Sequence, residues 1–304
     1  MNGQEKITYS ENGLIRAIEP FDFNKSLNFL EDFGSTEGEQ IIYENTLSKA
    51  FSFHGKAEVV RIRSKEEIDS PGLEYSLISD HAIDDHIKKT AIARITFFLS
   101  LDDDLLPFYE TGRKDQKFKP MIEQLYGYHQ VKFPTPFEGT CWAILTQRNA
   151  MQIAKRMKAK LVESYGTSLE IDGITYRAFP EPTKLIEAKE DKLMDVIKNS
   201  RRTKYLISAA EAFGDVDEEF LRTGKYEDVE AWLDNINGIG SWSASFVMLR
   251  SLGRMERLNL DDRWLHQAAS KVYGKDLSPE DVHEIADKYG QWQGYWAHYI
   301  RAVA

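Results

Sequence analysis

The chain has 304 residues, of which 42% are hydrophobic and 29% charged, with a formal net charge of −10 and a single cysteine. This composition excludes disordered and fibrous proteins, and the lone Cys141 excludes an intramolecular disulfide, a four-cysteine zinc site and a four-cysteine iron–sulfur cluster. Because no stretch approaches the roughly 18 apolar residues of a membrane span and the N-terminus lacks the apolar core of a secretory signal, we expect a cytoplasmic protein with no membrane partner.

The first part of the chain is expected to form an α+β lobe over residues 1–83. Apolar side chains alternate over residues 47–53 and again over 60–62, which predicts paired antiparallel strands. Apolar residues at helical spacing follow Asp22, a residue type that favours the first cap of a helix. Single hydrophobic cores stop growing near roughly 250–300 residues, so at least one further lobe is expected.

After this lobe the pattern is helical. We expect residues 84–115 to be a helical segment that packs with a C-terminal lobe, 116–253 to be a helical domain, and 254–304 to be the C-terminal helical lobe. Residues 109–136, rich in Lys and Pro, are expected to be a linker, and 169–176 a β-hairpin around Asp172-Gly173. Further helices are expected over 137–165 with a break at 147–149, and near 189–198, 202–213, 227–235, 241–252, 263–273, 279–288 and 292–303.

The net charge argues against a nucleic-acid partner, but its distribution weakens that argument. Residues 139–162 contain no acidic side chain and five basic ones, which are Arg148, Lys155, Arg156, Lys158 and Lys160. A locally basic face on an acidic protein can hold a phosphate backbone, although long-range attraction would be weak.

The most informative segment is a tight hairpin, Asn237-Gly238-Ile239-Gly240, between helices at about 227–252. Glycines permit backbone angles that side chains disfavour, and they leave amide groups bare at the start of the next helix, where the dipole favours an anion. Taken alone, these glycines are typical of an ordinary turn between two helices.

About twenty residues later the run Leu258-Asn259-Leu260-Asp261-Asp262 brings two carboxylates to the start of another helix. Alone, they are typical of helix caps. Together with the hairpin, the segment resembles the helix-hairpin-helix–Gly/Pro–Asp superfamily of DNA glycosylases. In that family the hairpin grips a phosphate and the Asp reaches the sugar of an extruded nucleotide. The resemblance implies that Asp262 is catalytic and that Asp261 is structural.

Other segments are similar to the AlkA-like branch, 3-methyladenine-DNA glycosylase II. These are Glu19–Leu30, Tyr43–Leu47, Phe137–Gln147 and Trp292–Tyr295. The resemblance implies a mainly α fold with an N-terminal α+β lobe, three lobes in all, and a cleft between the two helical lobes. The segment from Leu169 to Pro180 is also similar to the 8-oxoguanine glycosylases, so an oxidised-base enzyme of the same fold stays open, as does a non-catalytic DNA-binding module.

The resemblance also implies roles for particular residues. Trp242 and Phe246 would line the base pocket, with core aromatics as the alternative, and Arg148, next to Gln147, would fill the gap left by the flipped base unless it is a plain surface charge. The expected DNA contacts are Gly238, Gly240, Ser241, Gln147, Arg148, Arg201, Arg202 and Lys204. The backbone carbonyls of Asp234, Ile236 and Ile239 would hold a monovalent or similar cation.

Bifunctional members of the superfamily place a lysine two residues after the second hairpin glycine, where it forms a Schiff base with the sugar. This chain has Trp242 there, which favours a monofunctional glycosylase. The familiar bacterial members have a pocket tryptophan where this chain offers Arg301. We therefore expect a monomeric enzyme that hydrolyses the N-glycosidic bond of damaged, N-alkylated purines in double-stranded DNA and requires no cofactor.

Overall fold

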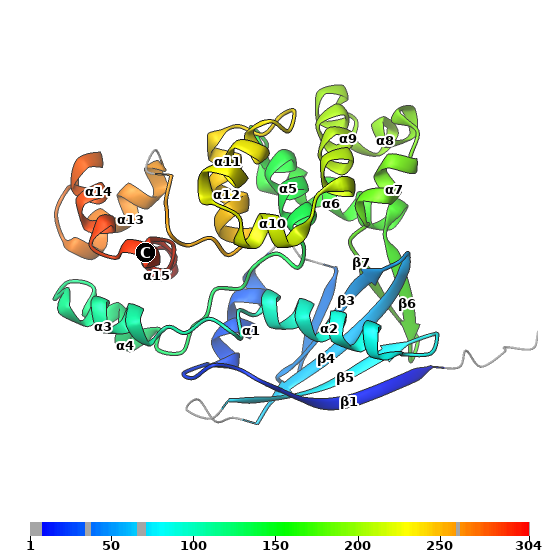
Figure 1. Ribbon diagram of the computed structural model, residues 1–304, viewed down its shortest axis with the longest axis horizontal. Coiled ribbons are helices and arrows are strands. Elements are labelled where there is room, and N and C mark those ends of the chain that lie inside the picture. The colour runs from blue at the N-terminus through cyan, green and yellow to red at the C-terminus, as the bar shows by residue number, and fades with distance from the viewer. Residues whose placement is uncertain (1–7, 34–37, 66–70, 260–261, 304) are drawn as a thin grey trace, which may run out of the picture.

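A computed structural model describes residues 8–33, 38–65, 71–259 and 262–303 of the chain. Helices predominate, and a five-stranded antiparallel sheet lies near the N-terminus (Figure 1), so the predicted mainly α fold with an α+β lobe is confirmed. In the described part of the chain, no helix combines the length and apolar character that a membrane crossing requires.

The sheet forms from the alternating segments that the sequence indicates. Its strands run in the order β1-β5-β4-β3-β2, and α1 covers part of one face. Asp22 accepts hydrogen bonds from the Asn24 and Lys25 N–H groups, as expected of a cap. The elements are β1 (Tyr9–Arg16), α1 (Phe23–Asp32), β2 (Gln40–Tyr43), β3 (Thr46–Phe53), β4 (Lys56–Ser64) and β5 (Gly72–Ser79).

The next helix, α2 (Asp85–Phe98), lies on the sheet (Figure 1). Its side chains Ala91, Ile95 and Phe98 enter the sheet's apolar core. The expectation that residues 84–115 pack as a whole with the C-terminal lobe is therefore wrong for α2, because its apolar face is covered by strands. The following helix, α3 (Leu106–Lys114), does pack with the C-terminal helices.

Residues 109–136 are not a plain linker, because they contain the end of α3 and all of α4 (Lys119–Gln124). Pro107 and Pro120 lie in the first turns of these helices, where proline's missing N–H costs nothing and its fixed φ favours helix initiation. Apolar side chains of both helices are buried against the C-terminal lobe, so α4 belongs with that lobe and not with the 116–253 domain.

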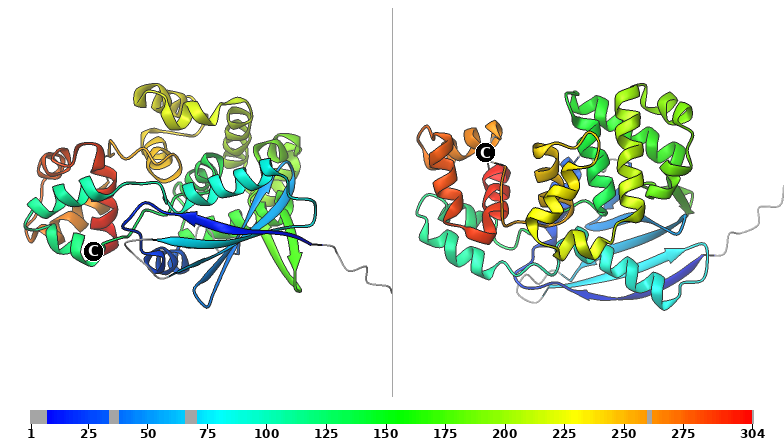
Figure 2. Two further views of the ribbon diagram at one scale, coloured as in Figure 1. Left: turned by 60° about the horizontal axis from the view of Figure 1, so that its bottom comes forward. Right: turned by 45° about the horizontal axis from the view of Figure 1, so that its top comes forward.

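The rest of the chain is helical apart from one small hairpin, as predicted. Two short helices, α7 and α10, were not expected. The elements are α5 (Pro136–Thr146), α6 (Met151–Tyr165), β6 (Thr167–Ile171), β7 (Ile174–Ala178), α7 (Pro182–Glu187), α8 (Glu190–Ile197), α9 (Ser200–Asp215), α10 (Glu218–Thr223), α11 (Tyr226–Asp234), α12 (Ser241–Ser251), α13 (Arg263–Tyr273), α14 (Pro279–Asp287), a 3-10 turn (Gly290–Trp292) and α15 (Gln293–Val303). Figure 2 shows α13–α15 beside α3 and α4.

A buried cluster of charges joins the sheet to the helical domain. Lys158 of α6 pairs with Glu39 and, at 2.8 Å, with Glu138 of α5, while Lys49 of β3 lies 3.6 Å from Glu39. All four side chains are almost inaccessible to solvent. Burial disfavours the charged form of Glu138, but Lys158 and Lys49 hold its pKa below the usual range. Lys158 is therefore not part of the basic surface that residues 139–162 suggested, because its ammonium group is buried and paired with two carboxylates.

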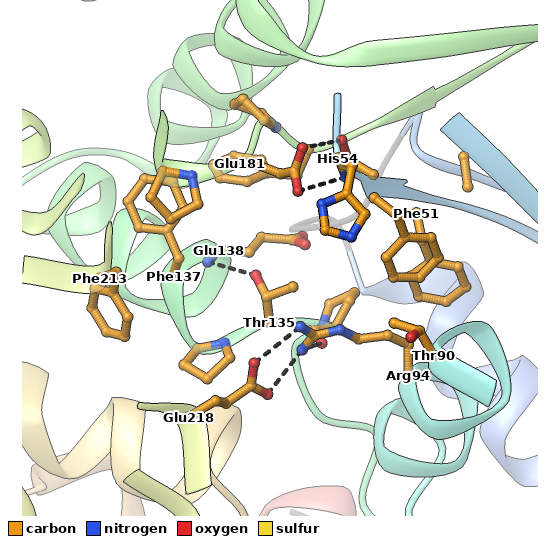
Figure 3. Close-up of a pocket in the computed structure, with 18 of the residues that line it drawn as sticks. Phe51, His54, Thr90, Arg94, Thr135, Phe137, Glu138, Glu181, Phe213 and Glu218 are labelled. Carbon is orange, nitrogen blue, oxygen red and sulfur yellow. Dashed lines mark hydrogen bonds and ion pairs between the residues drawn. The ribbon is translucent and has the colours of Figure 1, made fainter. Parts of the chain in front are cut away.

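A second set of contacts between these lobes surrounds a cavity of about 320 Å³ (Figure 3). Arg94 of α2 donates two hydrogen bonds of 2.9 Å to Glu218 of α10. Glu181, just before α7, accepts hydrogen bonds from the backbone N–H groups of His54 at 3.1 Å and Gly55 at 2.6 Å. The Arg94–Glu218 ion pair and the hydrogen bonds to Glu181 therefore connect the sheet and α2 to the helical domain.

Candidate active site

A larger cleft, with a volume of about 600 Å³, lies where α12, the start of α13 and α15 meet. This volume falls within the range of about 300–1,000 Å³ that is typical of small-molecule sites. Asp262, Trp242, Phe246 and Arg301 all line it. The fold thus brings together the carboxylate and the two aromatic residues that the sequence singled out, although the aromatic residues lie on α12 and the carboxylate caps α13.

Asp262 caps the N-terminus of α13, and both of its carboxylate oxygens are held in place. Its Oδ1 atom accepts hydrogen bonds from the backbone N–H groups of Trp264 at 2.9 Å and Leu265 at 3.2 Å. Its Oδ2 atom lies 2.6 Å from Arg301 Nη2 of α15. A helix N-terminus and a guanidinium group both favour a negative charge, so the site presents an oriented anion to the cleft. Asp261 lies outside the described residues.

Trp242 and Phe246 lie one turn apart on α12, with their rings stacked at 5.7 Å between centroids and 18° between planes. Trp242 is 48% exposed, which is inconsistent with a core residue, whereas Phe246 is partly buried against the helical core. An exposed indole on the wall of a cleft offers a flat surface on which a planar aromatic ligand can stack.

The two glycines of the hairpin before α12 differ in backbone conformation. Gly238 has φ of +91°, and a Cβ atom there would lie 2.3 Å from the Tyr205 ring, so only glycine fits. Gly240 has φ of −122°, and a Cβ atom there would meet nothing within 4 Å. The expectation that both glycines serve the backbone angles is therefore wrong for Gly240. Its lack of a side chain instead leaves open space in front of the α12 N-terminus, which no side chain of the described residues caps.

Two of the expected DNA-contact residues support the hairpin from within. Gln147 Nε2 donates hydrogen bonds to the Gly238 carbonyl at 2.7 Å and to Ser243 Oγ at 3.2 Å, and Arg202 Nη2 donates to the Gln147 carbonyl. The Gln147 amide nitrogen thus makes both of these hydrogen bonds within the protein, where they support the hairpin.

The other expected contact residues are exposed around the hairpin. Arg148 lies at the bend between α5 and α6 with φ of +50°, Arg201 and Lys204 are on α9, and Ser241 begins α12. The contacts that these side chains make with a ligand remain predictions.

The predicted cation site consists of carbonyl groups at the end of α11 and in the hairpin. The Ile236 carbonyl accepts the Ile239 N–H at 2.9 Å, which leaves its second lone pair for a cation. Carbonyl oxygens suit hard cations, so the donor set fits the predicted ion. Among the described residues, no group of three or more His, Cys, Asp or Glu side chains could hold a metal.

The cleft also contains polar residues to which the sequence offered no pointer: Gln130, Arg250 and His298. Gln130 lies between α4 and α5, Arg250 lies on α12, and His298 lies on α15. No local motif marks them, because they meet only when these three segments pack together.

Comparisons with known proteins agree with this geometry. The family model described as "HhH-GPD superfamily base excision DNA repair protein" matches residues 141–291. The DNA-3-methyladenine glycosylase of Bacillus subtilis (strain 168) is 27% identical over 298 residues, which are 95% of this chain and 96% of that protein. Its full-length alignment includes the α+β lobe as well as the hairpin domain.

Two solved structures share the fold across almost the whole chain. The 3-methyladenine DNA-glycosylase from Archaeoglobus fulgidus has a TM-score of 0.79 at 20% identity, with 96% of this chain and 99% of that chain covered. The apo-form of Clostridium acetobutylicum 8-oxoguanine glycosylase/lyase has a TM-score of 0.71 at 20% identity, with 98% and 99% covered. The family match, the full-length relative and the hairpin–Asp geometry together show that this chain belongs to the HhH-GPD superfamily of base excision DNA repair proteins, in its AlkA-like branch.

Proposed function

We propose that this protein is a monofunctional DNA glycosylase that extrudes and excises damaged purines, in particular N-alkylated ones, from double-stranded DNA. The observation that carries the proposal is the oriented carboxylate of Asp262 in one cleft with the exposed, stacked Trp242, next to a hairpin with a bare helix N-terminus. The full-length similarity to a protein named DNA-3-methyladenine glycosylase supports the choice of alkylated bases.

The chemistry needs only one carboxylate. Cleavage of the N-glycosidic bond builds positive charge on the sugar, which the Asp262 carboxylate would stabilise, either directly or by orienting the attacking water. Glycosidases commonly use a second carboxyl group as an acid, but an N-alkylated purine is already cationic and leaves without protonation. Arg301 holds Asp262 Oδ2, so it fixes the orientation of the carboxylate while sharing its charge.

The rest of the site would bind the extruded nucleotide and its strand. The ring of Trp242 would stack on the base, with a cation–π gain for a cationic one. Extrusion costs a few kcal/mol and costs least for weakened base pairs, which contributes to selectivity. The free N–H groups at the start of α12 would hold a phosphate, with a cation bound to the carbonyls of Asp234, Ile236 and Ile239 adding positive charge nearby. Arg148 would enter the gap in the duplex.

The proposed chemistry predicts a base-release reaction without strand cleavage. Duplexes carrying N-alkylated purines should lose the damaged base and keep an intact abasic strand until treated with alkali. Borohydride should trap no covalent complex, because Trp242 stands where a Schiff-base lysine would be.

Chromatography of released bases and denaturing gels with and without borohydride measure both results. Failure to release any alkylated base would overturn the function, and efficient trapping would overturn only its monofunctional character. Including 8-oxoguanine duplexes tests the oxidised-base alternative side by side.

Replacing Gly240 by valine is expected to weaken binding to damaged and undamaged duplexes alike, by about tenfold or more, which corresponds to 1.4 kcal/mol or more. The added side chain would occupy the open space in which a phosphate must approach the α12 amides. The fold should tolerate it, because φ at Gly240 is ordinary and the Cβ atom meets no neighbour. If neutral backbone amides supply much of the binding free energy, few phosphates are neutralised by basic side chains. The slope of log affinity against log salt should then be shallow, because each neutralised phosphate contributes about −0.9.

Fluorescence anisotropy over a salt series, with thermal melting as the check on folding, measures these effects. A control is Gly274→Ala, at the glycine C-cap of α13, where an added Cβ also meets nothing within 4 Å. Its positive φ costs stability but should not change DNA affinity. A folded Gly240→Val protein that binds normally would place the phosphate contact elsewhere, on exposed side chains such as Arg148.

A further inference from the structure

One part of the cleft contains buried polar side-chain atoms that make no hydrogen bond within the described residues. Gln130 and His298 line the cleft and are only 2% and 6% exposed. Within the described residues, Gln130 Oε1 and His298 Nε2 have no hydrogen-bond partner. Buried polar atoms are normally paired, because an unpaired one loses its hydrogen bonds to water without replacement. Two such atoms in one cleft point to a ligand that supplies the missing partners.

Arg250 adds an uncompensated positive charge to the same region. Its guanidinium group lies 5.3 Å from the ring centroids of both Phe29 and Phe33, and no carboxylate of the described residues forms an ion pair with it. Burial lowers the pKa of Arg250 to about 10, so the group stays charged at neutral pH. By contrast, the charge of Arg301 is balanced by Asp262. The N–H donors of Arg250 thus lack a charged acceptor.

His298 stays neutral beside these arginines. Burial lowers its pKa well below the usual value, and the nearby charges of Arg250 and Arg301 lower it further. A neutral imidazole and a primary amide can each donate or accept a hydrogen bond, whereas a guanidinium group can only donate. Arg250 therefore requires an acceptor atom in this region, and a base edge that presents an amine there instead would be disfavoured.

We propose that Arg250, assisted by the amide of Gln130 and the imidazole of His298, makes this enzyme prefer damaged purines that carry a carbonyl oxygen at ring position 6 over those that carry an amine at that position. This inference rests on the proposed function. Hypoxanthine and 7-methylguanine have a carbonyl oxygen at ring position 6, where 3-methyladenine has an amine. Guanidinium donors pair well with such an oxygen, as arginine does with guanine. A site built to donate a hydrogen bond discriminates strongly against a base that cannot accept it.

The test uses two substrates and the full-length protein. Methylated duplex DNA contains both 7-methylguanine and 3-methyladenine, so the ratio of the initial rates of their release, each divided by its abundance, is an internal measure of preference. A hypoxanthine-containing duplex reports on a neutral base with the same carbonyl group. This base leaves with the electron pair of the broken bond as an anion, which a hydrogen bond from the Arg250 guanidinium group to the carbonyl oxygen would stabilise. The wild-type protein should release 7-methylguanine with the higher normalised rate, and it should release hypoxanthine.

Arg250→Met keeps much of the side-chain stem but removes the charge and the donors. It should shift the normalised ratio toward 3-methyladenine by about tenfold or more and slow hypoxanthine release by a similar factor. Gln130→Glu, which adds a carboxylate beside Arg250, should shift the ratio in the same direction. Arg113→Met, an exposed arginine on α3 outside the cleft, is the control and should leave the ratio unchanged.

The outcomes separate this inference from the function on which it rests. If the wild-type protein releases no damaged base at all, the proposed function fails. If it releases bases but prefers 3-methyladenine, or if folded Arg250→Met and Gln130→Glu proteins keep the wild-type ratio, the role of Arg250 fails and the glycosylase function stands. Thermal melting establishes which variants are folded, and the wild-type ratio decides the matter even where a variant is not.

Discussion

Replacing Asp262 by asparagine is expected to abolish base release while the fold and most of the DNA binding remain. Asparagine caps helices about as well as aspartate, so its Oδ1 atom can keep the bonds to Trp264 and Leu265. The substitution removes the negative charge that would stabilise the sugar cation, and loss of one preorganised electrostatic group costs on the order of 10²–10³ in rate. Single-turnover release of an alkylated base measures the loss.

A matched control for this substitution is Asp84→Asn, at the cap of α2. Asp84 Oδ1 accepts the Ile87 N–H at 2.8 Å, so it has a similar capping role, but it does not line the cleft. Its substitution should leave base release within about twofold of the wild type, since a surface cap contributes only to stability. A folded Asp262→Asn protein with near wild-type release would remove Asp262 from the mechanism.

Replacing Lys158 by methionine is expected to lower the free energy of unfolding by about 3–5 kcal/mol, because removal of one partner leaves uncompensated buried charges. Lys158 Nζ pairs with both Glu39 and Glu138, and all three side chains are excluded from solvent. Methionine fills a similar volume but leaves the excess negative charge of the two carboxylates inside the protein. Urea unfolding monitored by circular dichroism measures the change.

The control is Lys160→Met on the same helix. Lys160 is exposed, and its substitution should change stability by no more than about 0.5 kcal/mol. Equal stabilities for the two variants would show that the buried cluster contributes little to holding the sheet and the helical domain together. Because the cluster lies outside the cleft, a folded Lys158→Met protein should retain base-release chemistry at low temperature.

The features that the sequence predicted correctly depend on residues close together in the chain. The cap at Asp22, the hairpin before Ser241 and the start of α13 at Asp262 each arise from a few consecutive residues. Local backbone preferences and hydrophobic periodicity determine such features directly. The resemblance to a family of glycosylases rests on the spacing of these same local motifs.

Other features depend on packing between distant segments, and a linear pattern does not contain them. Residue type made Lys158 a basic surface residue, but tertiary structure places it among buried carboxylates. The hydrogen bonds that Gln147 makes to the hairpin likewise depend on packing between distant segments. The helices in 109–136 were missed because their prolines are equally typical of linkers and of first helical turns.

The cleft contains both kinds of feature, those set by local sequence and those set by packing. The sequence by itself determined that Asp262, Trp242 and the hairpin glycines have the spacing along the chain that is typical of the glycosylase family, because each lies within a short motif. Only the tertiary structure decided that Arg301 pairs with Asp262 and that Arg250, Gln130 and His298 share the cleft. These side chains come from segments far apart in the chain, and their mutual distances are set by how the lobes pack, which no local preference specifies.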